Sequence, residues 1–227
     1  MSSVVIAGDT SGSITLAAPA VAGTTTLTLP ASTGNVVTDS ATQTLTNKTL
    51  TSPTISGTVS GLTSASLPTG SVLQVVSTTK TSVFSTTSTS FVDVTGLSVS
   101  ITPSSSSNKI LVFVSCSMSA DWDDRVQPLQ LLRDSTAIGL SDQSGTSRIR
   151  TSGGAMMSQN VSDQSSQTNN VAFQYLDSPS TASSVTYKIQ TRCGTGNTIY
   201  LGRTGDSTDD ANRASYPATI TVMEIKG

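Results

Sequence analysis

The clearest structural signal in the sequence is the stretch KILVFVSCSMSA at residues 109–120. Its even-numbered positions from Ile110 to Met118 are apolar, as expected of one buried face of a β-strand, because successive side chains of a strand point to opposite sides. Leu111 and Phe113 add apolar side chains to the other face. A strand that is apolar on both faces needs a partner besides the core, so this stretch predicts a buried strand with an additional contact surface.

The remainder of residues 71–227 repeats the β pattern. Val185, Tyr187 and Ile189 alternate with polar side chains, which is typical of a strand buried on one side. No convincing helix interrupts the series, and about nine short strands predict an all-β sandwich or jelly roll. The predicted strands lie at residues 71–78, 90–101, 109–120, 127–133, 136–141, 168–177, 184–193, 197–202 and 217–226.

Two further strands also carry apolar side chains on both faces. In the last strand Ile220 and Val222 oppose Met223 and Ile225, and near residue 173 two aromatic side chains oppose smaller apolar ones. Apolar side chains that cannot all face one core are candidates for a subunit interface. The residues expected to form this interface are Leu111, Phe113, Phe173, Tyr175, Met223 and Ile225.

Residues 1–79 differ sharply from the rest of the chain. They hold only three charged side chains, Asp9, Asp39 and Lys48, and no aromatic one. Large apolar side chains supply most of the area that offsets chain entropy, so this part needs a partner to be stable. Within it, residues 1–40 contain short strand signals separated by Gly and Pro, which predicts a small β module that docks onto another protein.

Residues 41–70 form a Ser/Thr-rich connector. A short echo, TLTN at 44–47 followed by TLTS at 49–52, precedes sparse apolar residues. Composition alone is typical of a flexible linker. The alternative is a fibrous shaft, in which three chains wind together and their isolated Leu, Ile and Val side chains meet at the axis. Both hypotheses give the segment a connecting role and no chemistry.

Composition argues against several functional classes. The formal net charge is −2 with scattered Lys and Arg, so no surface for nucleic acid is expected. No run of about 18 apolar residues and no apolar leader are present, so we expect neither membrane insertion nor secretion. The 41 serines and 38 threonines alternate with Val, Ile and Leu, which favours strands over a disordered coil. Cys116 and Cys193 could pair or remain small buried thiols.

The sequence offers little for catalysis. It contains no histidine, which removes the commonest general base and metal ligand together with the Ser-His-Asp and Cys-His nucleophile systems. Paired carboxylates could still hydrolyse a polysaccharide, and since Glu224 is the only glutamate, aspartates would have to supply them. We expect a protein that is not an enzyme, with no catalytic residues, no cofactor and no metal.

Two acidic clusters are the most distinctive polar features, and both fall in predicted loops. Solvated turns are one interpretation, because Asp favours turns. A Ca²⁺ site is another, although neither cluster has the spacing of an EF-hand loop. A third is contact with a receptor or glycan, since loops carry function and Trp stacks on sugar rings. The candidate residues are Asp121, Trp122, Asp123, Asp124 and Arg125 in the first cluster, and Asp206, Asp209 and Asp210 in the second.

Several segments resemble proteins of bacteriophage particles. VVIAGDTSGSITLAAPAVAGTTTLTLP at 4–30 and TQTLTNKTLTSPTISG at 42–57 are similar to amino-terminal and shaft segments of tail fibres. The carboxy-terminal domain often found on such proteins is resembled by STSFVDVTGLSVSITPSSSSNKILV at 88–112, LLRDSTAIG at 131–139, FQYLDSPSTASSVTYKIQ at 173–190 and ITVMEIKG at 220–227. The resemblance implies a virion protein, a homotrimer, and a jelly-roll tip like that of the tumour-necrosis-factor superfamily.

Together these inferences predict a short trimeric tail fibre, made and assembled in the bacterial cytoplasm. Residues 1–40 would dock to a tail, baseplate or capsid protein, residues 41–70 would connect, and residues 71–227 would expose a jelly-roll-like sandwich to the host surface and its glycans. A head fibre or capsid decoration protein is the nearest alternative. A capsular polysaccharide depolymerase and a secreted adhesin are further alternatives.

Overall fold

In the computed structural model the chain divides into two units, Met1–Ser56 and Gly57–Gly227. The boundaries expected near residues 40 and 70 stay predictions. No helix in the described ranges is long and apolar enough to cross a membrane. The described residues are 3–7, 10–17, 49, 51–121, 126–142, 145, 147–156, 167–194, 197–205 and 210–227.

The first unit contains an antiparallel hairpin. Strand β1 (Ser3–Ala7) pairs with β2 (Ser13–Ala17). Val5 and Ile6 point to opposite faces because they are adjacent in a strand, and both side chains are exposed. A two-stranded hairpin is at best marginally stable alone, so this one needs a further contact to persist.

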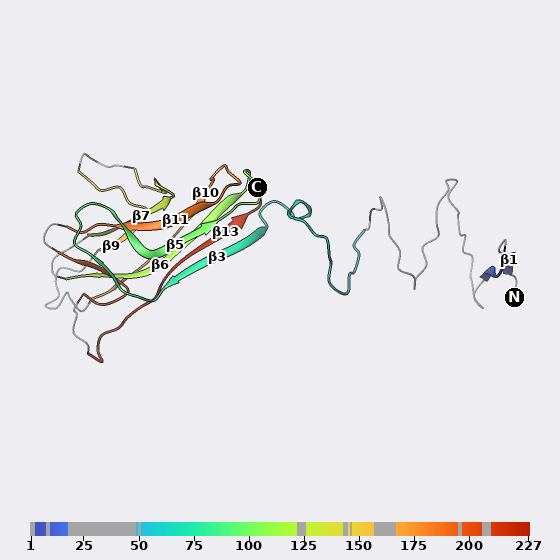
Figure 1. The fold of residues 1–227 in the computed structure, drawn as a ribbon, viewed down its shortest axis with the longest axis horizontal. Coiled ribbons are helices and arrows are strands. Elements are labelled where there is room, and N and C mark those ends of the chain that lie inside the picture. The colour runs from blue at the N-terminus through green and yellow to red at the C-terminus, as the bar shows by residue number, and fades with distance from the viewer. Residues whose placement is uncertain are drawn as a thin grey trace. The chain divides into compact units, whose positions relative to one another are not determined.

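The second unit is an antiparallel β-sandwich preceded by the 3₁₀ turn η1 (Ser64–Ser66). Its six-stranded sheet contains β3 (Val72–Lys80), β13 (Ala218–Ile225), β6 (Lys109–Ala120), β10 (Asn169–Asp177), β12 (Ile199–Leu201) and β4 (Phe84–Thr86). The five-stranded sheet contains β5 (Val92–Ile101), β11 (Val185–Thr191), β7 (Val126–Arg133), β8 (Thr136–Ile138) and β9 (Gly153–Met156). The prediction of an all-β sandwich for this part of the chain is confirmed (Figure 1).

Strand β6 occupies the middle of the six-stranded sheet. It pairs with β13 along one edge and with β10 along the other, while β12 continues the β13 side beyond Ser117. Ile110, Val112 and Met118 are completely buried, whereas Leu111 and Phe113 on the opposite face are half-buried. The period of two in the sequence therefore gives the orientation of this strand correctly.

The core lies between the sheets and draws aliphatic side chains from both of them. Each fully buried Val, Leu or Ile side chain contributes roughly 1.5–3 kcal/mol relative to an exposed one, so this layer is the main source of stability. Its most deeply buried members include Leu97, Ile110, Val112, Met118, Leu129, Leu131, Tyr187, Ile189, Ile199, Leu201, Ile220 and Val222.

The sandwich has a base, where β3 begins and β13 ends, and a tip at the opposite end. At the base Gly70 N–H donates to the Lys226 carbonyl (2.8 Å), and Lys226 N–H donates to the Ser71 carbonyl (2.9 Å). The Lys226 ammonium also donates to the Ala65 and Leu67 carbonyls. These contacts hold the residues that lead into β3 against the last residues of the chain (Figure 1).

One core position carries a polar side chain. Gln127 lies on the inner face of β7 in line with Leu129 and Leu131 and is completely buried. Neither its amide oxygen nor its amide nitrogen has a hydrogen-bond partner among the described residues. A buried amide without partners costs about 1–3 kcal/mol. Gln127 is therefore a weak point in the core near the tip.

We predict that Gln127→Met stabilises the sandwich by about 1 kcal/mol or more, because methionine fills the same space without a desolvation cost. Urea denaturation followed by circular dichroism measures the change. Gln130→Met is the matched control, since Gln130 on the same strand donates to the Arg150 carbonyl (2.8 Å). The free energy of unfolding of this control variant should fall or stay unchanged. A destabilised Gln127→Met variant would contradict the prediction.

Candidate interaction surfaces

Asp121 and Asp210, the described members of the two acidic clusters, lie at the tip. Strand β6 runs from base to tip and ends just before Asp121, while β13 runs from tip to base and begins after Asp210. The sequence alone did not place the two clusters at one end, because the strands between them could not be counted. Trp122, Asp123, Asp124, Arg125, Asp206 and Asp209 lie outside the described residues.

The two described aspartates of these clusters accept hydrogen bonds from nearby backbone N–H groups. The Asp121 carboxylate accepts from the Thr198 N–H, and its own N–H donates to the Thr198 carbonyl (3.1 Å). The Asp210 carboxylate accepts from the Asn212 N–H (2.7 Å) and side-chain amide (2.9 Å), which forms an Asx turn. The described residues contain no group of three or more Cys, Asp or Glu side chains that could hold a metal ion.

The outer face of the six-stranded sheet carries an apolar row. Val75, Met223, Leu111 and Leu176 are consecutive cross-strand neighbours on β3, β13, β6 and β10. The outer pair, Val75 and Leu176, are 54% and 48% exposed. Ile225 lies on the same face toward the base. Four adjacent strands thus present apolar side chains that no layer of described residues in this unit covers.

Phe173 and Tyr175 do not lie on this face, which corrects the sequence-based expectation for their orientation. Both point inward from β10 and pack against the core. A Cβ atom at Gly153 would lie 2.6 Å from Cδ1 of Phe173, and one at Gly139 would lie 2.8 Å from Cδ2 of Tyr175. The aromatic rings therefore close the side of the sandwich against Gly153 on β9 and Gly139 just after β8.

The reason for this orientation is the register of β10, which the sequence pattern left ambiguous. Pairing sets Leu176 beside Leu111 and Ala172 beside Ser115 on the outer face, so Phe173 and Tyr175, which alternate with these residues, must face inward. Leu176 and Val75 are the interface candidates that the sequence reasoning missed. Alternation on β10 and β3 could have suggested them, but only cross-strand register brings them into one row.

On β5 and β11 the outer face of the five-stranded sheet is polar and its side chains bind one another, whereas Val126 and Met156 are exposed on β7 and β9. Ser100 and Thr186 hydroxyls lie 2.8 Å apart, and Asp93 accepts from Lys188 (2.8 Å) and Gln190 (2.7 Å). The hydrogen bond from Lys188, supported by that from Gln190, lowers the pKa of Asp93. On these two strands the outer face is polar and suited to contact with water, in contrast to the apolar row on the outer face of the six-stranded sheet.

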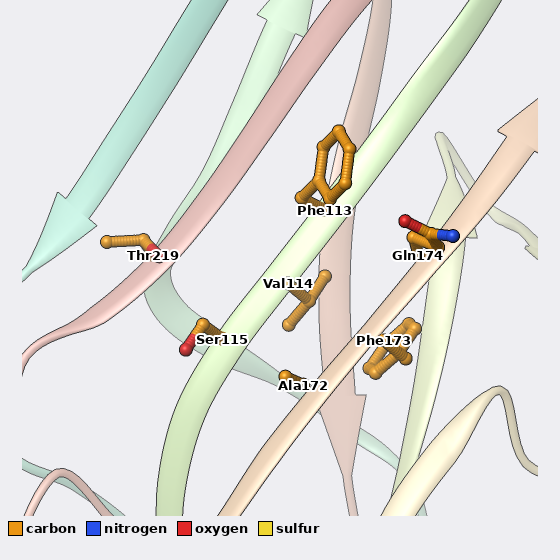
Figure 2. Close-up of a pocket in the computed structure, with 7 residues that line it drawn as sticks. All are labelled: Phe113, Val114, Ser115, Ala172, Phe173, Gln174 and Thr219. Carbon is orange, nitrogen blue, oxygen red and sulfur yellow. The ribbon is translucent and has the colours of Figure 1, made fainter.

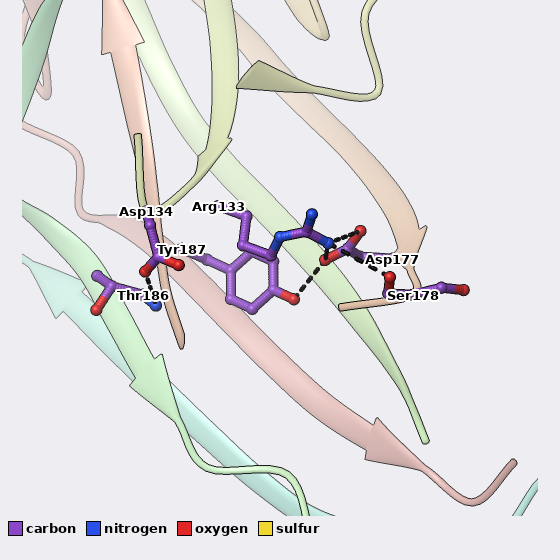
Figure 3. Close-up of polar contacts among 6 residues, drawn as sticks. All are labelled: Arg133, Asp134, Asp177, Ser178, Thr186 and Tyr187. Carbon is purple, nitrogen blue, oxygen red and sulfur yellow. Dashed lines mark hydrogen bonds and ion pairs between the residues drawn. The ribbon is translucent and has the colours of Figure 1, made fainter. Parts of the chain in front are cut away.

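A partly buried ionic cluster joins the two sheets near the base. Arg133 Nη1 on β7 donates to both carboxylate oxygens of Asp177 on β10 (2.9 Å each), and the Tyr187 hydroxyl on β11 donates to Asp177 Oδ2 (2.7 Å) (Figure 3). Burial raises the pKa of Tyr187, and its hydrogen bond to Asp177 raises it further. Because Asp177 is engaged by two partners and buried, the cluster serves to fix strand positions.

The two cysteines lie in the interior of the sandwich. Cys116 and Cys193 are buried, and no disulfide joins them. Burial raises the pKa of the Cys116 thiol to about 12, so this side chain behaves as a small apolar group at neutral pH. Of the two alternatives that the sequence left open, that of small buried thiols is the one found in the structure.

Glu224 is a buried carboxylate held by neutral donors. Its Oε1 accepts from Ser104 N–H (2.6 Å), Ser104 Oγ (2.8 Å) and Asn108 Nδ2 (2.5 Å), and its Oε2 accepts from Gln74 Nε2 (2.6 Å). Burial opposes ionisation, yet these hydrogen bonds outweigh it, and the pKa of Glu224 is lowered from its ordinary value of 4.5. Glu224 therefore ties the β5–β6 loop to β13 and β3.

No protein-family model and no curated protein matches this chain.

We predict that Glu224→Gln destabilises the sandwich by about 1–3 kcal/mol at neutral pH, since one amide N–H₂ must then face donor groups. The folded pKa of Glu224 is lowered, so its contribution is present above pH 4.5 and is lost as the pH falls through the folded pKa. The free energy of unfolding of the variant should accordingly differ most from that of the parent protein near pH 7 and least in acid.

Denaturation midpoints measured across this pH range test the prediction. Asp142→Asn provides the control, because Asp142 is an exposed carboxylate between β8 and β9. A constant stability difference between Glu224→Gln and the parent protein from pH 7 into acid would argue against the linkage.

Proposed function

We propose that this chain is a structural protein of a bacteriophage particle, namely a short homotrimeric tail fibre. The supporting observation is the contrast between the two outer faces of the sandwich. The six-stranded sheet carries an apolar row that no described residue of this unit covers, whereas β5 and β11 of the other sheet carry polar side chains that are hydrogen-bonded to one another. A sandwich with one uncovered apolar face calls for association, and association of identical chains is the form that the segment resemblance implies.

The strand order supports a jelly-roll assignment. The order β3-β13-β6-β10 in one sheet and β5-β11-β7-β9 in the other places sequence-distant strands side by side. Long crossovers of this kind are typical of jelly rolls, in which two Greek keys are wound together. We therefore propose a jelly-roll fold for this unit together with the trimer.

At the base the chain enters β3 through Gly70 and Ser71, and the loops at the other end of this unit are proposed as the surface for host contact. Loops on a rigid scaffold commonly carry binding residues. Residues 1–40 are proposed to dock to the particle, and the exposed Val5 and Ile6 of the hairpin offer apolar contacts for that purpose. In a trimer, three weak binding sites act together and give a higher overall affinity for the host surface than one site alone. Binding, rather than catalysis, is the proposed mechanism.

We predict that Met223→Lys and Leu111→Lys convert the trimer into monomers, because each buries an unpaired ammonium group in the contact between copies. Multi-angle light scattering should report three times the 23.2 kDa chain mass for the parent protein and one chain mass for each variant. Thr186→Lys, on the wet face of the other sheet, is the control and should leave the mass unchanged. A parent protein that is itself monomeric would refute the trimer.

Location in the particle is tested by labelling the protein in intact phage and imaging by electron microscopy. The proposal expects label at the tail. Label distributed over the capsid lattice, with none at the tail, would replace the tail-fibre assignment with that of a head fibre or decoration protein.

A further inference from the structure

A groove lies on the outer face of the six-stranded sheet, on the tip side of the apolar row. Its volume is about 360 Å³. Figure 2 shows Phe113 and Ser115 of β6 flanked by Thr219 of β13 and by Ala172 and Gln174 of β10. The small side chains of Ser115 and Ala172 are direct cross-strand neighbours, and the larger ones stand around them. A concave lining of this size falls in the range of small-molecule sites.

The polar side chains of this groove are uncommitted. Ser115, Gln174 and Thr219 make no side-chain hydrogen bond to any described residue, although each can both donate and accept. The wet face of the other sheet differs, since Ser100, Thr186 and Gln190 bind neighbouring side chains there. The groove thus combines free hydrogen-bonding capacity with the half-buried ring of Phe113.

The groove is also free of charge. No Asp, Glu, Lys or Arg is among its described lining residues. Of the charged residues on β3, β6, β10 and β13, Lys80, Asp177 and Glu224 are buried, and Lys109 lies at the base end of β6. A charged ligand group in the groove would lose hydration without gaining an ion pair. This lining favours a neutral ligand.

We propose that the groove binds a neutral saccharide, with the C–H face of a sugar ring against Phe113 and sugar hydroxyl groups bonded to Gln174, Ser115 and Thr219. An apolar ring beside uncommitted amide and hydroxyl groups matches the two kinds of surface that a sugar presents. The inference rests on the proposed host-binding function and adds a ligand site on the sheet face to the contact proposed for the tip loops. Trimer contact through the apolar row, nearer the base, leaves this part of the face open.

The test uses the full-length protein on an array of neutral oligosaccharides and of matched oligosaccharides that contain uronic or sialic acids. We expect retention by one or more neutral glycans and weaker retention by their acidic counterparts. Gln174→Leu and Ser115→Val should each reduce binding to the retained glycan about tenfold or more, because a sugar hydroxyl is left without its partner. Both positions are exposed, so these variants should fold normally.

Ser100→Val is the matched control, since Ser100 occupies the outer face of the other sheet and should leave glycan binding unchanged. Retention by acidic glycans alone, or equal binding by the groove variants and the parent protein, would overturn the inference. So would an absence of glycan binding accompanied by a changed association state in Gln174→Leu, which would identify the groove as a contact between copies. Adsorption of the parent protein to host cells is measured in parallel, and its absence would instead count against the proposed function.

Discussion

Strand β6 is paired along both edges and is apolar on both faces over residues 110–114, and the sandwich is organised around this strand. Its inner side chains fix the position of the five-stranded sheet, which must cover them to exclude water. Its outer side chains, Leu111 and Phe113, cannot be covered by the same sheet. This one strand therefore contributes both to the core and to the outer surface that no described layer covers. Its neighbours β10 and β13 supply the other side chains of the groove and extend the apolar row.

Much of this arrangement follows from local sequence pattern. The stretch 109–120 coincides with β6, and the alternation of Val185, Tyr187 and Ile189 identifies the inner face of β11. These features depend on side chains two residues apart in one strand, which a sequence displays directly. The short strands β4 and β9 were not predicted, because three or four residues with little apolar character leave no recognisable period.

The features that sequence could not supply depend on contacts between distant segments. The inward orientation of Phe173 follows from the register of β10 on β6 and from the space above Gly153. The burial of Glu224 depends on donors from Gln74, Ser104 and Asn108, which no local pattern connects. The apolar row likewise needs four strands in correct register. For the candidate surfaces, the sequence therefore identified several members, but their grouping required the structure.

The hydrogen bonds between Gly70, Ser71 and Lys226 also have a mechanical consequence. They extend the pairing of β3 with β13 toward the base, where the chain enters the sandwich. If the tip is held and the preceding segment is pulled, the force runs along β3 and loads the rungs of this ladder together in shear. A ladder sheared in parallel resists more force than one opened rung by rung. The unit is thus built to bear tension between its base and its tip.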